Sequence, residues 1–110
     1  MVNEHNLDLH AMQAAAARAC GMLKVLGNPD RLLLLCQLTR GEFCVSELEA
    51  QLRIGQPTLS QQLGVLRDEG LVSTRREGKQ IYYKIDSPEA TASMQLVYEL
   101  FCQPGKGGSQ

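Results

Sequence analysis

The sequence predicts a mainly α-helical protein with five helices and one small β-hairpin. Apolar residues recur at spacings of three and four through most of the chain, as they do on the buried face of a helix. Alternation of apolar and polar residues, which is typical of a strand, is confined to residues 71–85. The 110 residues, of which 44% are hydrophobic and 21% charged, fit a single globular domain over residues 1–110.

The first two helices are predicted over residues 8–26 and 29–38. The first is rich in alanine and carries its apolar residues at helical spacing. Gly27 and Asn28 interrupt it, and Pro29 suits the first turn of the second helix. The dense run LLLLC in the second helix indicates a central position with apolar contacts on nearly all sides.

A third helix is predicted to begin at Ser46, because Ser46 and Glu49 have the spacing of a capping box. Its apolar positions are few, so we expect a short helix on the surface of the domain. About three residues separate it from a fourth helix, which has Pro57 in its first turn and Gly70 at its C-terminal cap. Two short helices with a tight connection predict a helix-turn-helix.

The stretch over residues 71–85 is predicted to form a two-stranded hairpin with a charged tip. Because an isolated hairpin is only marginally stable in water, one face should pack on the helices while the tip projects as a wing. Ser87 and Pro88 then indicate the start of a last helix. We expect this helix to end near residue 103 and residues 104–110 to form a flexible tail.

The fourth helix and the hairpin tip together have the residue types of a DNA-binding surface. One face of the helix is polar and uncharged, and such side chains can hydrogen-bond base edges in the major groove, although a merely solvated face has the same composition. Residues 53–84 contain six Lys and Arg against three Asp and Glu, within a chain of net charge −1. We expect groove contacts from Gln56, Thr58, Ser60, Gln61 and Gln62, and phosphate or minor-groove contacts from Arg75, Arg76 and Lys79.

Three segments resemble the ArsR family of bacterial winged helix-turn-helix repressors, in the order expected for that family. They are LGNPDRLLLLCQL at residues 26–38, SELEAQLRIGQPTLSQQLGVLRDEGLV at 46–72 and TRREGKQIYYKI at 74–85. The resemblance implies a homodimer, held by its first and last helices, that binds a palindromic double-stranded operator. Independently, the two terminal helices have more apolar surface than one small domain can cover, which favours association of two copies.

The four cysteines, Cys20, Cys36, Cys44 and Cys102, are the candidates for signal sensing. Thiolate metal sensors of the family have two cysteines separated by one residue, and here the second position is Ser46, whose hydroxyl is a poor ligand for soft metals. Cys36 and Cys102 resemble the pair of the branch that responds to persulfide and sulfide. By that resemblance, reactive sulfur species join the two thiols in a disulfide or polysulfide bridge, and the repressor releases its operator.

Other assignments of the cysteines are open. A soft-metal-responsive repressor would use Cys44 with Cys20, and Cys44 is also an alternative redox partner. The apolar neighbours of Cys36 are also typical of a buried residue that only packs in the core. Cys20 is expected to pack in the first helix. His5 and His10 are expected to be solvated near the N-terminus, so no resident metal and no cofactor are expected.

Other functional classes have less support in the sequence. An enzyme is not expected, because the chain has neither a CxxC pair nor a Gly-rich phosphate loop. A winged-helix module for protein interaction is a further alternative, given the modest net charge. The N-terminal residues lack the order of a secretion signal and no apolar run approaches the length of a membrane span, so a cytoplasmic protein without membrane contact is expected.

Overall fold

The computed structural model describes residues 8–102 and confirms the predicted fold of five α-helices with a small β-sheet. The predicted tail at residues 104–110 and His5 lie outside the described residues. The elements follow the order α1 (Leu9–Leu26), α2 (Pro29–Leu38), β1 (Phe43–Cys44), α3 (Val45–Leu52), α4 (Thr58–Asp68), β2 (Val72–Glu77), β3 (Gln80–Ile85), α5 (Pro88–Val97) and a π-helical turn (Tyr98–Cys102).

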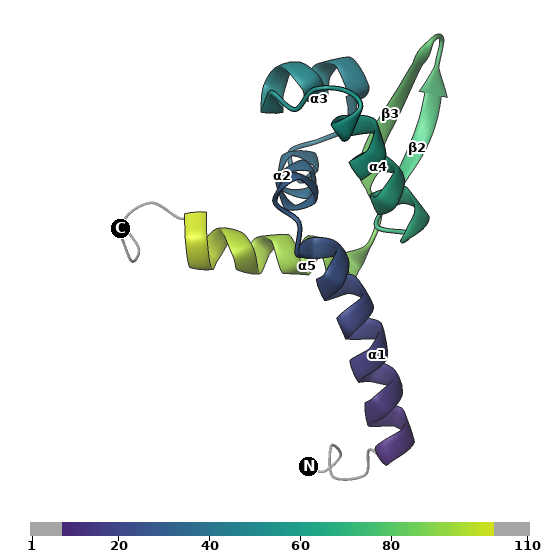
Figure 1. Ribbon diagram of the computed structural model, residues 1–110, viewed down its shortest axis with the longest axis vertical. Coiled ribbons are helices and arrows are strands. Elements are labelled where there is room, and N and C mark those ends of the chain that lie inside the picture. The colour runs from purple at the N-terminus through teal and green to yellow at the C-terminus, as the bar shows by residue number, and fades with distance from the viewer. Residues whose placement is uncertain (1–7, 103–110) are drawn as a thin grey trace.

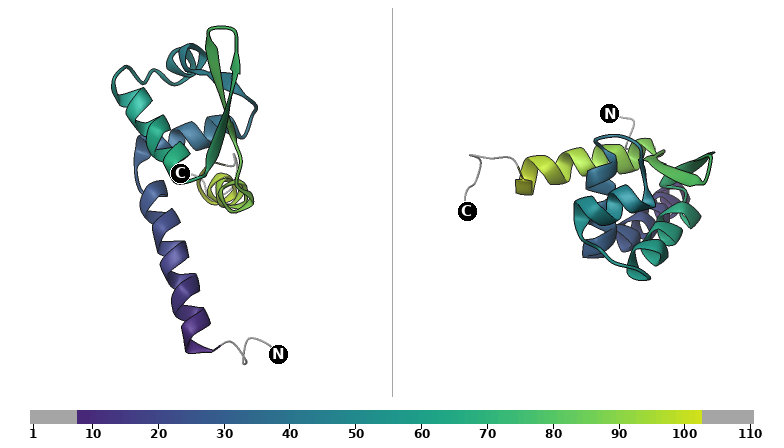
Figure 2. Two further views of the ribbon diagram at one scale, coloured as in Figure 1. Left: turned by 90° about the vertical axis from the view of Figure 1, so that its right-hand side faces the viewer. Right: turned by 90° about the horizontal axis from the view of Figure 1, so that it is seen from above.

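Helices α2, α3 and α4 and the sheet form the body of the molecule, and α1 and α5 extend from it in different directions (Figures 1 and 2). The two projecting helices give the chain a radius of gyration of 16.5 Å, compared with about 13 Å for a compact domain of this size. The outer parts of α1 and α5 therefore have surfaces that the rest of the same chain does not cover. None of the helices in residues 8–102 combines the length and the apolar character that crossing a membrane requires.

The core confirms the prediction that α2 is central. The prediction of apolar contacts on nearly all its sides is wrong, because Leu33 on α2 is 44% exposed. Six leucines from α2, α3 and α4 are almost fully inaccessible to solvent, and each such burial contributes about 1.5–3 kcal/mol to folding. They are Leu34, Leu35, Leu48, Leu59, Leu63 and Leu66. Since three of the six belong to α4, the side of this helix opposite its polar face anchors it in the core.

Local capping signals set the ends of several helices as predicted. The side chain of Asn28 accepts a hydrogen bond from the backbone N–H of Arg31 at 3.0 Å, directly before Pro29 begins α2. The Ser87 hydroxyl does the same for Ala90 at 3.1 Å at the start of α5. Each cap satisfies a backbone donor that has no partner within its helix.

The start of α3 differs from the prediction. The helix begins at Val45, and the side chain of Glu47, rather than Glu49, accepts from the backbone N–H of Cys44 at 3.0 Å. The predicted capping box at Ser46 is therefore wrong, because the N-cap is Cys44, two residues earlier, and the helix starts at Val45. The reason is that Cys44 pairs with Tyr82 in a strand, so its backbone remains extended up to the point where the helix begins.

The sheet has three strands in the order β1-β3-β2, so the prediction of a two-stranded hairpin was incomplete. Strand β1 is only two residues long and pairs antiparallel with β3, with Phe43 opposite Tyr83. This strand joins the connection between α2 and α3 to the hairpin. The wing is therefore attached to the helical body by backbone pairing as well as by side-chain packing.

The hairpin itself has the predicted position. Strands β2 and β3 pair in an unbroken antiparallel register from Val72 opposite Ile85 to Glu77 opposite Gln80. Gly78 adopts a positive φ of 64° in the tight turn, a conformation that costs glycine little. Val72 is buried near the body and the far residues of β2 are exposed, so the tip of the wing projects into solvent.

Gly70 ends α4 as predicted and fixes the direction in which the chain enters the wing. It has a φ of +77°, and its N–H donates to the carbonyl of Arg67 at 3.0 Å. The next N–H, that of Leu71, donates to the carbonyl of Leu66 at 3.0 Å, which completes a Schellman motif. At the other end, Pro57 precedes the helix at the N-cap position instead of standing in its first turn.

Candidate functional site

The polar face of α4 lies on the outside of the molecule, opposite the buried leucines. Gln56, Ser60 and Gln61 are exposed, and Thr58 is half-buried. Gln56 accepts through Oε1 from the Ser60 hydroxyl at 2.7 Å and from the Ser60 backbone N–H at 3.3 Å, so it also caps the helix. The structure thus leaves four of the five predicted groove-contacting residues accessible on α4 or directly before it. Helix α4 itself lies beside the wing (Figure 1).

Gln62, the fifth predicted contact, is half-buried and already has a partner. Its Oε1 accepts from Nη1 of Arg31 at 2.8 Å. This hydrogen bond fixes the orientation of the Gln62 amide relative to α2. Sequence reasoning did not identify Arg31, because the two residues lie 31 positions apart in the chain.

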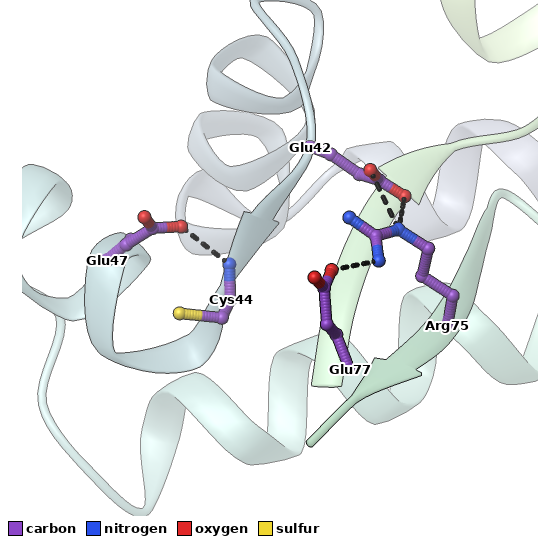
Figure 3. Close-up of polar contacts among 5 residues, drawn as sticks. All are labelled: Glu42, Cys44, Glu47, Arg75 and Glu77. Atoms are coloured by element: carbon purple, nitrogen blue, oxygen red, sulfur yellow. Dashed lines mark hydrogen bonds and ion pairs between the residues drawn. The ribbon is translucent and has the colours of Figure 1, made fainter. Parts of the chain in front are cut away.

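Arg75 on the wing is held by two carboxylates (Figure 3). Its Nε donates to both oxygens of Glu42 at 3.0 Å, and Nη1 donates to Glu77 at 2.5 Å. The guanidinium carbon also lies 4.7 Å from the centre of the Tyr82 ring, within the range of a cation–π interaction. The hydrogen bond to Glu77, and to a smaller extent that to Glu42, raises the pKa of Arg75 above its ordinary value.

The other two predicted phosphate contacts lie closer to the tip of the wing. Arg76 and Lys79 are exposed, and Nε of Arg76 donates to the carbonyl of Gly78 at 3.4 Å. The two residues carry positive charge at the end of the hairpin, where a projecting wing can reach a nucleic-acid backbone. Arg75, by contrast, shares its charge with two carboxylates of the protein.

Cys36 on α2 and Cys102 in the π-helical turn line the same cavity, although they lie far apart in the sequence. The cavity has a volume of about 600 Å³. It lies between α2 and the continuous C-terminal helix that α5 and the π-helical turn form together. Cys36 is half-buried and Cys102 is exposed. The remaining walls combine apolar and polar side chains, namely Leu33, Gln37, Thr39, Arg40, Leu52, Met94, Gln95, Tyr98 and Glu99.

The environment of Cys36 favours its protonated form. Burial, and secondly the nearby Cys102, raise the pKa of the Cys36 thiol above its ordinary value. Its Sγ lies 3.7 Å from Sδ of the buried Met94, which can accept a weak hydrogen bond from the thiol. Cys102 is the more accessible of the two nucleophiles.

The other two cysteines lie in different surroundings. Cys20 is exposed on α1, and Cys44 is buried with its Sγ 3.3 Å from Oγ of Ser46. Figure 3 shows Cys44 at the start of α3, with the Glu47 carboxylate directed to its backbone. Within residues 8–102, His, Cys, Asp and Glu side chains form no cluster of three or more that would suit a metal ion.

Comparisons with known proteins identify the family. Residues 28–74 match the family of bacterial regulatory proteins described as the arsR family. The chain is 51% identical over 98 residues to the biofilm growth-associated repressor of Agrobacterium fabrum, an alignment that covers 89% of this chain and 84% of that protein.

Solved structures agree in fold. The transcriptional repressor BigR from Xylella fastidiosa superposes with a TM-score of 0.80 at 47% identity, over 88% of this chain and 99% of that one. Reduced HlyU from Vibrio cholerae superposes with a TM-score of 0.82 at 40% identity, over 86% and 100%. The prediction that the protein is not an enzyme is confirmed by these relatives. The chain belongs to the arsR family of bacterial regulatory proteins and is a DNA-binding winged helix-turn-helix transcription regulator.

Proposed function

We propose that the protein is a transcriptional repressor that binds a palindromic operator as a homodimer and releases it when reactive sulfur species join Cys36 to Cys102. The observation that carries the sensing part is that these two thiols, from two different helices, line one cavity. A covalent bond between the two thiols across this cavity would change how α2 and the C-terminal helix pack.

The DNA-binding part rests on α4 and the wing. The exposed uncharged side chains of α4 suit base edges in the major groove, and Arg76 and Lys79 suit phosphates. The relative from Agrobacterium fabrum and BigR are both described as repressors. As a regulator that meets its operator on bacterial DNA, the protein acts in the cytoplasm.

The dimer part rests on exposed apolar side chains at the two ends of the chain. Phe101 is 81% exposed, and large apolar residues are also exposed on α1, a pattern that marks an association surface. The exposed residues on α1 are Leu9, Met12 and Leu23, and those on the C-terminal helix, besides Phe101, are Leu96, Tyr98 and Leu100. Two copies joined through α1 and α5 place their α4 helices, which we call the recognition helices, in successive major grooves about 34 Å apart.

An organic persulfide, RSSH, is the oxidant of the two thiols in the proposed reaction. The Cys102 thiolate attacks the terminal sulfur of RSSH, the S–S bond of RSSH breaks, and RSH leaves with a proton from solvent. Cys36, as its thiolate, then attacks Sγ of the Cys102 persulfide and displaces sulfide. The two thiols are oxidised to a disulfide, and the sulfane sulfur is reduced to H₂S. Capture of a further sulfane sulfur before closure gives a longer polysulfide bridge.

The cavity and the helices explain how this bridge reaches the DNA. A volume of about 600 Å³ lies in the range of small-molecule sites, so an organic persulfide can approach both thiols. The bridge draws the π-helical turn towards α2 and changes the position of the α5 surface that joins the two subunits. A changed dimer geometry alters the spacing of the recognition helices and weakens operator binding.

The test follows operator binding by fluorescence anisotropy before and after treatment with glutathione persulfide, and again after a reductant. We expect the wild type to lose affinity and to recover it, whereas Cys36→Ser and Cys102→Ser variants keep their affinity. Cys20→Ser and Cys44→Ser are the matched controls and should respond like the wild type. A full response of the Cys36→Ser and Cys102→Ser variants contradicts the proposal.

Intact-protein mass spectrometry identifies the chemistry in the same samples. The proposal predicts a loss of two hydrogens, or this loss with a gain of whole sulfur atoms, in a fragment that links Cys36 to Cys102. A response to soft metals that Cys44→Ser or Cys20→Ser abolishes would instead support a metal-responsive repressor.

A further inference from the structure

Arg31, in the first turn of α2, makes hydrogen bonds to two other helices at once. Its Nε donates to the carbonyl of Val25 at 2.7 Å, and Nη2 donates to the carbonyl of Lys24 at 3.4 Å, both in the last turn of α1. Its Nη1 donates to Oε1 of Gln62 on α4 at 2.8 Å. One side chain thus connects the helix that projects from the body with the helix that carries the polar face.

The chemistry of Arg31 makes this connection directional. The guanidinium is planar, so donors aimed at α1 fix the direction of the donor aimed at α4. The carbonyl end of α1 carries the negative end of the helix dipole, which favours a cation there. Arg31 is half-buried, and its own backbone N–H donates to the side chain of Asn28 at 3.0 Å. The backbone of Arg31, from which the side chain extends, is therefore held in place.

Apolar packing alone leaves the relation between α1 and α4 less defined. Val25 is the one residue of α1 that is fully part of the buried core, and most of α1 beyond it is exposed. Leucine contacts tolerate small rotations, whereas a hydrogen bond weakens steeply as its angle departs from linear. The three bonds of Arg31 consequently restrict rotation of α1 relative to α4 near the point where α1 leaves the body.

We propose that Arg31 is a positioning residue that fixes the recognition helix, α4, relative to α1 and so sets the half-site spacing that the dimer accepts. The proposal rests on the proposed function, because it needs two subunits joined through α1. A small rotation at the end of α1 is carried across the dimer and changes the distance between the two copies of α4. Gln62 then serves as the acceptor that holds α4, with its amide oxygen directed to Arg31 and away from the bases.

The test measures preference for half-site spacing in addition to affinity. An operator is first selected from a random DNA library with the wild-type protein, and versions are made with one or two base pairs inserted or removed between the half-sites. We expect the wild type to bind the selected spacing best. In Arg31→Gln the ratio between the selected and altered spacings should fall about tenfold, the scale of one lost charged hydrogen bond.

Three further single variants and one double variant separate positioning from stability. Arg31→Lys keeps the charge but loses the planar fork, and it should lose spacing preference like Arg31→Gln even where its melting temperature stays near that of the wild type. Arg18→Gln removes an exposed charge from α1, away from the hydrogen bonds of Arg31, and should keep the preference. Gln62→Met removes the acceptor, and the double variant Arg31→Gln with Gln62→Met should lose no more preference than either single variant.

The outcomes distinguish the two proposals. An unchanged spacing ratio in both Arg31 variants overturns the positioning role, as does a uniform loss of affinity for all spacings. In either case two-site binding by the wild type leaves the proposed function standing. A wild type that binds single half-sites as well as paired ones overturns the proposed dimeric function and the positioning role with it.

Discussion

Nε of Arg75 lies 3.0 Å from both carboxylate oxygens of Glu42, which ties the middle of the wing to the residue just before β1. The second carboxylate, Glu77, lies on the same strand as Arg75. Both ion pairs are partly solvated, with 49% of the Arg75 side chain exposed, so each contributes little to stability. Their larger effect is on the charge that the wing presents to DNA.

Replacing Glu77 by Gln should strengthen DNA binding at low salt. The change removes a negative charge from the wing and releases one arm of Arg75, which can then neutralise a phosphate. For each additional phosphate that the wing neutralises, the plot of log affinity against log salt should steepen by about 0.9. Glu99→Gln, which removes an exposed carboxylate from the π-helical turn, is the matched control. Identical salt slopes for the Glu77 variant and the wild type would contradict the prediction.

Cys102 should be alkylated several-fold faster than Cys36 near pH 8. The thiolate is the reactive form, and burial together with Cys102 raises the pKa of Cys36, so less Cys36 thiolate is present at this pH. Because the pKa of Cys36 is raised, its alkylation rate should continue to rise with pH after the rate of an ordinary thiol has levelled. Iodoacetamide labelling of the wild type, followed by mass spectrometry of the separate cysteine-containing peptides, measures both rates. A Cys36 that reacts as fast as Cys102 would be inconsistent with this environment.

Gly70→Ala should lower the free energy of unfolding by about 1–2 kcal/mol, whereas Gly64→Ala should raise it by up to about 1 kcal/mol. Both glycines have open space where a Cβ would stand, with nothing within 4 Å. They differ in backbone conformation, because Gly70 has a φ of +77° and Gly64 lies inside α4. Urea denaturation at equal protein concentration compares the two. Equal effects of both substitutions would show that the positive φ is not what determines their cost.

Phe101→Glu should raise the dimer dissociation constant by about a hundredfold or more, since leaving an unpaired charge in an interface costs about 3–5 kcal/mol. Phe101 is the most exposed of the large apolar residues on the C-terminal helix. Analytical ultracentrifugation over a range of concentrations measures the constant. Thr91→Glu, at an exposed position near the start of α5, should leave it unchanged. Unaltered dimerisation of the Phe101 variant would place the interface elsewhere.

The features that the sequence predicted well depend on neighbouring residues. Asn28 with Pro29, Ser87 with Pro88, and Gly70 each act within about one helical turn, so their effect is visible in a short stretch of sequence. The leucines of α2 and α4 likewise show their buried faces through spacing alone. These local signals were sufficient to predict five helices, the hairpin and the exposed polar face.

The features that were missed depend on residues far apart in the chain. Arg31 and Gln62 are separated by 31 positions, and Glu42 and Arg75 by 33. Strand β1 exists only because β3 lies beside it, and it shifts the start of α3 from the predicted Ser46 to Val45. No short pattern marks such partners, so the sequence could name Gln62 and Arg75 but not what holds them.

The strand order β1-β3-β2 also bears on how the protein behaves at high concentration. A strand with unpaired backbone groups at the edge of a sheet can recruit strands from other molecules. Here the sheet has β1, of two residues, at one edge and the charged β2, with Arg75, Arg76 and Glu77, at the other. Shortness protects the first edge and charge protects the second. The wing can therefore project into solvent without pairing with strands of other molecules.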